Sequence, residues 1–201
     1  TLALALFRNY QVGGATLVAD VEYTSELSVH LAGDIDWKNH QGRLEVETIP
    51  SDGQPSVAER VVFGESEVYT SAQPEQVRRA EAAGRSDVQW VRRPPDPERP
   101  VDQLIALLVS LAATRPENPA LLEQQDLVFD REATVGKQAV VVYRSPMAEY
   151  WVGEDDGTLL RFVGRLRGFT GEASFTFTDQ RSVAVSTPDP TEAIEADQLP
   201  S

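Results

Sequence analysis

Long runs of alternating apolar and polar residues constrain this sequence most. In the first run, Leu17, Ala19, Val21 and Tyr23 alternate with polar residues; in the next, Leu27, Val29, Leu31, Ile35 and Trp37 do so. A period of two predicts strands with one buried face and one face in water. The same pattern returns from Leu127 to Phe177, where Asp156-Gly157 between two alternating runs predicts a hairpin. Two blocks of this kind predict a large antiparallel sheet.

A helical block separates the two strand blocks. Pro74 opens a polar segment that Gly84 ends, and a proline-dense connector over 92–100 leads to a second helix, over 101–113. This second helix is apolar around most of its circumference, so we expect it to be buried on several sides. A short third helix is predicted over 120–125, after Asn118-Pro119.

The order of these segments predicts one α+β domain over residues 1–201. Its parts are an N-terminal helix (1–12), a first strand block (13–72), a helical insertion (73–125), a second strand block (126–187) and a loose acidic tail (188–201). The residues expected to face the helices are Leu17, Leu31, Ile35, Leu44, Val61, Phe129, Val141, Phe162 and Phe175.

Composition excludes several classes of function. The chain has no cysteine and two histidines, which excludes thiolate catalysis, zinc ribbons and histidine-rich metal sites. A net charge of −14 argues against nucleic acid as a partner, because phosphate binding needs a basic surface. No nucleophile elbow or phosphate-binding loop is present. We therefore expect no catalytic residue, no metal and no cofactor, and so a protein that is not an enzyme.

One acidic group has the spacing of a cation or acid–base site. Asp34 and Asp36 are two residues apart on one strand, next to His30, and carboxylates at this spacing can bind a hard cation. Nothing else in the sequence completes such a site, so a solvated strand face is the favoured interpretation.

The C-terminal half resembles a known superfamily. Three motifs carry the resemblance over about 60 residues: the hairpin Tyr150-Trp151-Val152-Gly153-Glu154-Asp155-Asp156-Gly157-Thr158-Leu159-Leu160-Arg161, the strand Phe175-Thr176-Phe177-Thr178-Asp179, and the exit Val183-Ala184-Val185-Ser186-Thr187-Pro188. Their order is similar to that of the LolA/LolB-like superfamily, and especially of mycobacterial lipoproteins of the LppX/LprG type. The connector and helices over 93–122 look like an actinobacterial subgroup.

The resemblance implies a strongly curved antiparallel half-barrel with helices on its concave face and an apolar cavity between them. It implies a lipoprotein-like domain that holds a lipid or other apolar ligand. The residues expected to line that cavity are Leu31, Ile35, Trp37, Leu104, Leu108, Val141, Phe162 and Phe175. The alternative is a cell-surface interaction or sensing module with a filled cleft and a protein partner, contacted near Trp151 or Arg92-Arg93.

The resemblance also places the domain outside the cytoplasm, in the cell envelope. We expect a signal or membrane anchor upstream of Thr1, which follows no methionine, and contact with the membrane only through that anchor. The high negative charge would keep the domain itself away from anionic lipid surfaces.

Overall fold

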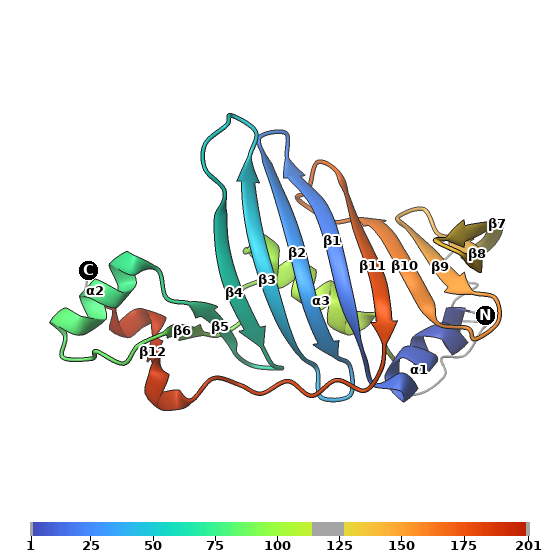
Figure 1. The fold of residues 1–201 in the computed structure, drawn as a ribbon. Coiled ribbons are helices and arrows are strands. Elements are labelled where there is room, and N and C mark those ends of the chain that lie inside the picture. The colour runs from blue at the N-terminus through green and yellow to red at the C-terminus, as the bar shows by residue number, and fades with distance from the viewer. Residues whose placement is uncertain (1, 114–126, 200–201) are drawn as a thin grey trace.

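The alternating segments build a twelve-stranded sheet that curves without closing (Figure 1). The computed structural model describes residues 2–113 and 127–199. The first strand block contains β1 (Gly14–Thr24), β2 (Leu27–Asp36), β3 (Gln41–Pro50), β4 (Val57–Phe63) and β5 (Val68–Ser71). The later strands are β6 (Trp90–Arg93), β7 (Val128–Val135), β8 (Gln138–Arg144), β9 (Ala148–Gly153), β10 (Leu159–Arg165), β11 (Glu172–Gln180) and β12 (Ala193–Glu195). The helices are α1 (Leu2–Val12), α2 (Pro74–Ala82) and α3 (Pro100–Ser110), with 3-10 turns at Pro190–Glu192 and Ala196–Gln198.

The strand order joins the two blocks through β1. The order is β12-β6-β5-β4-β3-β2-β1-β11-β10-β9-β8-β7, so β1 pairs with β2 on one side and with β11 on the other. All neighbouring strands are antiparallel except β12 and β6, which are parallel over three residue pairs. The predicted curved antiparallel sheet and α+β class are therefore confirmed.

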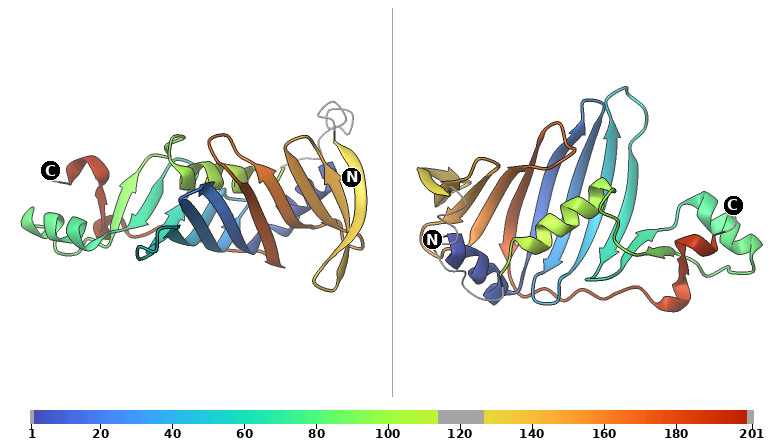
Figure 2. Two further views of the ribbon diagram at one scale, coloured as in Figure 1. Left: turned by 90° about the horizontal axis from the view of Figure 1, so that it is seen from above. Right: turned by 180° about the vertical axis from the view of Figure 1, so that it is seen from behind.

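Helix α3 lies across the concave face of the sheet (Figure 2). It begins with Pro100 at its first position, and Leu104, Ile105 and Leu108 are buried. Two buried polar side chains tie it to the rest of the fold: the Trp37 indole donates to the Leu108 carbonyl at 3.0 Å, and Asn9 Nδ2 donates to the Leu111 carbonyl at 2.7 Å. Both bonds satisfy carbonyl groups near the C-terminal end of the helix.

The other two helices pack at opposite ends of the sheet. Helix α1 contacts β9 and β10. Helix α2 lies away from the concave face, where its Ala80 packs with Val88, Val91 and Ile194 beside β6 and β12. The prediction of helices on the concave face therefore holds for α3 and for α1, whose Leu2, Ala3 and Ala5 belong to the same core cluster, while α2 covers the β6–β12 edge.

Two glycines allow close packing within the sheet. A Cβ on Gly33 would lie 2.0 Å from the Arg43 carbonyl oxygen of the neighbouring strand, and a Cβ on Gly42 would lie 2.2 Å from the Phe63 ring. Only glycine fits at both positions without separating the strands or expelling the ring.

Most of the predicted inward residues are buried. Leu17, Leu31, Ile35, Leu44, Val61, Phe162 and Phe175 are at most 3% exposed. Val141 is half-buried on β8. The prediction for Phe129 is wrong, because its side chain is 60% exposed on β7, the last strand of the sheet.

The helical insertion and the tail differ from expectation in detail. Helix α3 ends at Ser110 rather than 113, since Leu111 no longer has helical geometry. The predicted helix over 120–125 lies outside the described residues. Part of the segment expected to be a loose tail forms β12, which pairs with β6.

Candidate binding site

The residues predicted to line a cavity are core residues. Seven of the eight belong to the main apolar core and are at most 3% exposed: Leu31, Ile35, Trp37, Leu104, Leu108, Phe162 and Phe175. The eighth, Val141, pairs with Val152 of that core and is half-buried. The seven core side chains belong to one packed cluster between α3 and the sheet, where the prediction had placed a ligand.

Aromatic rings fill much of this space. Trp37 and Phe177 lie with ring centroids 5.5 Å apart, and Phe162 contacts both Tyr150 (5.2 Å) and Phe175 (6.1 Å). Burial raises the pKa of the Tyr150 hydroxyl above its usual value. The concave core is thus packed by the protein's own rings.

A smaller hollow remains beside α3. It has a volume of about 260 Å³ and is lined by Val68, Pro95, Ile105, Ala106 and Val109, with His40 and Asp102 among its polar neighbours. It lies between α3 and β5, at the margin of the concave face, and is mainly apolar.

The carboxylates considered as a cation site have separate structural roles. Asp34 accepts from Arg43 at 2.6 Å and from Thr16 at 2.8 Å. Asp36 accepts from the backbone N–H of Lys38 at 3.0 Å, inside a turn. Nδ1 of His30 lies 2.7 Å from Asp20 Oδ1. Among residues 2–113 and 127–199, no group of three or more His, Cys, Asp or Glu side chains could hold a metal ion.

A larger hollow lies on the outer face, the face opposite α3. Here the C-terminal segment over 181–189, which we call the strap, runs along the sheet from β11 toward β12 (Figure 1). Between strap and sheet is a hollow of about 410 Å³, the strap pocket, within the size range of ligand sites. It is lined by Ala32, Glu45, Arg60, Val62, Trp90 and Pro188, among others.

A tryptophan and an arginine form one wall of the strap pocket. The Arg60 guanidinium lies 5.0 Å from the centre of the Trp90 ring. Trp90 also packs against a small apolar cluster of three buried residues, Val62, Tyr69 and Ala193. The half-buried indole is therefore held from two sides, which fixes the shape of the wall.

The strap begins at a buried carboxylate. Arg181 of the strap donates to Asp34 at 3.4 Å and to Thr16 at 2.8 Å, beside the Arg43–Asp34 pair. Burial alone would raise the pKa of Asp34. The hydrogen bonds from Arg43 and Thr16 and the charges of Arg43 and Arg181 outweigh it, so the pKa lies below its usual value. Asp34 therefore stays ionised and holds the start of the strap.

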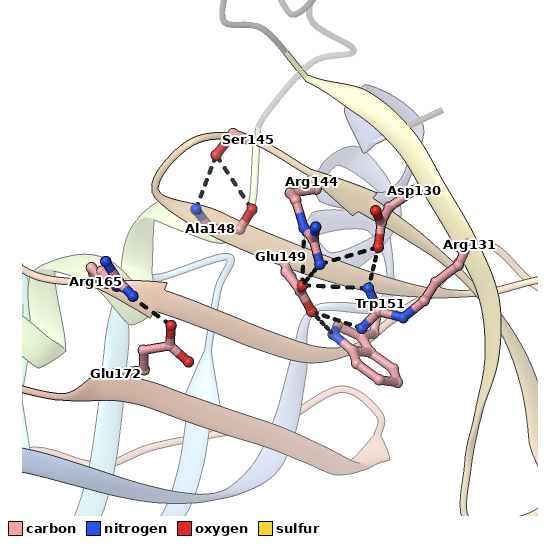
Figure 3. Close-up of polar contacts among 9 residues, drawn as sticks. All are labelled: Asp130, Arg131, Arg144, Ser145, Ala148, Glu149, Trp151, Arg165 and Glu172. Atoms are coloured by element: carbon pink, nitrogen blue, oxygen red, sulfur yellow. Dashed lines mark hydrogen bonds and ion pairs between the residues drawn. The ribbon is translucent and has the colours of Figure 1, made fainter.

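A second polar cluster lies on the outer face near the other end of the sheet (Figure 3). Glu149 accepts from Arg131 at 3.1 Å and from Arg144 at 2.6 Å, and Trp151 donates to it at 3.2 Å. The hydrogen bond from Arg131 is the main reason why the pKa of Glu149 lies below its usual value; burial opposes it and Arg144 reinforces it.

Trp151 is covered by arginines rather than open to solvent. The guanidinium groups of Arg131 and Arg161 lie 5.1 Å and 5.3 Å from its ring centre. Its ring packs over a small cluster around Val140 and Val142. Trp151, near which the sequence predicts a partner contact, therefore lies on the outer face as a half-buried ring.

The strap pocket was missed by sequence reasoning. The predicted organisation places Trp90 within the helical insertion (73–125) and Pro188 in the loose tail (188–201). The alternation of Val183 and Val185 with polar or small residues was the available signal that this segment follows a surface.

Comparisons with known proteins give structural similarities only. The sequence matches no family model and no curated protein. An uncharacterised conserved protein from Thermus thermophilus aligns over 96% of both chains, with 14% identity and a TM-score of 0.48. A crystal structure of MucB aligns with 17% identity and a TM-score of 0.41, and the MucA/MucB complex of Pseudomonas aeruginosa with 16% and 0.40. The alignment with MucB covers 100% of this chain and 60% of that chain; the alignment with the MucA/MucB complex covers 99% of this chain and 59% of that chain. The present chain thus spans about three fifths of the length of these two chains.

No helix within the described ranges combines the length and apolar character needed to cross a membrane.

Proposed function

We propose that this chain is a non-enzymatic binding domain that engages a protein partner through the outer face of its sheet. The observation that carries this proposal is the packing of the concave core: seven of the eight residues expected to line a lipid cavity belong to one packed cluster and are at most 3% exposed. This favours the interaction module over the lipid carrier.

The outer face has the features of a contact surface. It carries two half-buried tryptophans, Trp90 and Trp151, each stacked with arginine side chains. Tryptophan and arginine are enriched among the residues that dominate protein–protein binding energies. Of the two tryptophans, Trp90 adjoins the larger hollow, so we place the main contact at the strap pocket.

We further propose that the domain works outside the cytoplasm, in the cell envelope, tethered by an upstream anchor. The resemblance of the C-terminal motifs to LolA/LolB-like proteins supports this location. The net charge of −14 is compatible with a domain held near, but not on, an anionic membrane.

A second candidate function is the binding of an apolar ligand beside α3. The hollow of about 260 Å³ along Ile105, Ala106 and Val109 supports it. Each methylene buried there would contribute about 0.8 kcal/mol.

One experiment separates the two functions. A photo-crosslinking amino acid is placed at Ser186, at the strap pocket, or at Glu22, an exposed outer-face position on β1, and the full-length protein is irradiated in its own cells. The partner-binding function predicts a discrete protein adduct from position 186 that is weaker from position 22. It is refuted if neither position forms a protein adduct.

The second candidate is tested on the same preparation. Native mass spectrometry would find an apolar adduct that the Ala106→Trp substitution removes, because the new side chain fills the hollow. A wild-type mass without adduct, even after addition of a fatty acid, excludes this candidate.

A further inference from the structure

The strap carries a run of backbone groups that are not paired within the protein. Its first residue, Arg181, donates its N–H to the Gly14 carbonyl at 3.1 Å, and pairing resumes where Thr191 and Glu192 donate to Asp189. Within the described chain, residues 182–188 make no hydrogen bond to one another or to the sheet. Six of these seven residues offer a backbone N–H donor, Pro188 being the exception.

Side chains nevertheless hold the strap in place. Val183 occupies the space that Gly14 leaves free, since a Cβ on Gly14 would lie 2.8 Å from Val183. Val185 packs against the cluster of Val62 and Tyr69. Both valines are half-buried, whereas Ser182, Ala184 and Ser186 between and beside them are exposed. The strap therefore resembles a strand that is docked by one face and has its hydrogen-bonding groups available.

The strap pocket opens beside this unpaired backbone. Ser186 and Pro188 of the strap form one side, and Trp90 and Val62 form the apolar side opposite. An extended peptide that pairs with a strand edge gains affinity from main-chain bonds and specificity from pockets for its side chains. The strap and its pocket provide both elements next to each other.

The charges around the pocket indicate the character of such a peptide. Arg43 forms an ion pair with Asp34 at 2.6 Å, and the Arg60 guanidinium lies over the Trp90 ring. Glu45, directly across from Arg60 in the strand register, is exposed and makes no ion pair with any described residue. Glu45 is the one carboxylate among the described lining residues, and together with the net charge of −14 it favours a basic flank on the ligand at the β3 side of the pocket.

We propose that the strap pocket binds an extended segment of a partner protein, with one bulky apolar residue in the pocket and a lysine or arginine beside it facing Glu45. The segment pairs with the backbone of residues 182–188. This inference rests on the proposed partner-binding function and names the chemistry of the partner at that site.

Synthetic peptides test this proposal directly. The probes are nine-residue peptides with a central leucine flanked by lysines, the same peptide with a central serine, and the same peptide with aspartate flanks. Binding is measured by fluorescence anisotropy at low and at physiological salt. The lysine–leucine peptide should bind best, and its affinity should fall as salt rises. Equal binding of the three peptides, or no binding, overturns the proposal.

Variants locate the peptide on the structure. Glu45→Lys should weaken the lysine-flanked peptide by about fivefold or more and improve the aspartate-flanked one. Glu22→Lys makes the same charge change on the same face, away from the pocket, and should have a smaller effect. Ser186→Trp should block the pocket without removing a core residue. Identical effects of Glu45→Lys and Glu22→Lys would show general charge attraction and refute the site.

Hydrogen exchange provides a readout of backbone pairing. The bound peptide should slow exchange of amides within 182–187, and unchanged exchange there refutes pairing with the strap. A dimer that Ser186→Trp dissociates would identify a second copy as the occupant and also overturn the peptide proposal. If crosslinking at position 186 succeeds while the peptides fail, the partner-binding function stands and this inference does not.

Discussion

Replacing Leu108 with alanine measures how well the space between α3 and the sheet is filled. Leu108 is 0% exposed, and the substitution removes three carbon groups. At about 0.8 kcal/mol per group, the lost transfer free energy is about 2.4 kcal/mol. The cavity left in a packed core adds to it, so we expect a loss of about 3–4 kcal/mol in the free energy of unfolding. In a chain of this size that corresponds to a fall in Tm of about 6–16 °C.

Leu4→Ala is the matched control, because it makes the same chemical change on a helix. Leu4 is 56% exposed, and its truncation should change stability by less than about 0.5 kcal/mol. Urea unfolding followed by tryptophan fluorescence gives both free energies, with the slope checked for two-state behaviour. Benzene should stabilise Leu108→Ala but not the wild type, since an empty apolar cavity binds it. A loss below about 1 kcal/mol for Leu108→Ala, or stabilisation of the wild type by benzene, would falsify the filled-core interpretation.

Three further substitutions test contacts around the concave face. Asp102→Ala should cost about 3–5 kcal/mol, because it leaves the Arg93 guanidinium, paired with Asp102 at 2.5 and 2.8 Å, buried without its counter-charge. Glu59→Gln should stabilise the protein at neutral pH. Burial raises the pKa of Glu59 above 4.5, and the charge of Arg93 opposes this only in part. The unfolded chain therefore loses this proton first, and the contribution of Glu59 to stability falls from about pH 4.5 up to its native pKa. Gly33→Ala should cost about 1–3 kcal/mol, because its Cβ would lie 2.0 Å from the Arg43 carbonyl oxygen.

Each of these three has a control in the same urea assay. Glu75→Ala breaks an ion pair that is fully exposed and should change the midpoint little. Gly64→Ala places a Cβ 3.9 Å from its nearest neighbour, Gln41, and should be tolerated. For Glu59→Gln the control is pH itself: the gain should vanish well below pH 4.5, where the carboxyl is protonated in both states. A gain that is equal at low and neutral pH refutes the titration argument.

The sequence predicted which face of a strand each side chain occupies better than it predicted which other elements cover that face. Alternation assigned Leu31, Ile35, Phe162 and Phe175 to the apolar side, and all four are buried. The same rule failed for Phe129, because a period of two says which face a side chain occupies and not whether anything covers it. Phe129 lies on β7, the last strand of the sheet, and its side chain is 60% exposed.

The candidate site could not be predicted, because its parts come from distant segments. Trp90 follows α2, Pro188 follows the last long strand, and Ala32 and Glu45 belong to β2 and β3. The pairing of β12 with β6 fixes the far end of the strap, and three residue pairs leave almost no periodic signal in the sequence. The wide apolar surface of the 101–113 segment was recognised, but period and composition do not distinguish a helix that lines a cavity from one that fills it.

The place of β1 in the sheet determines when the fold can be completed. Ala15 pairs with Ile35 on one side and with Gln180 on the other, so one edge of the central strand waits for a segment synthesised more than 150 residues later. Until β11 arrives, an eleven-residue strand with several buried apolar positions has an unpaired edge. Pairings of such sequence separation form slowly and leave the nascent chain open to mispairing. The late arrival of β11 therefore closes the middle of the sheet, and only β12, at the margin, pairs after it. A chaperone that shields the free edge of β1 would act until β11 has been synthesised.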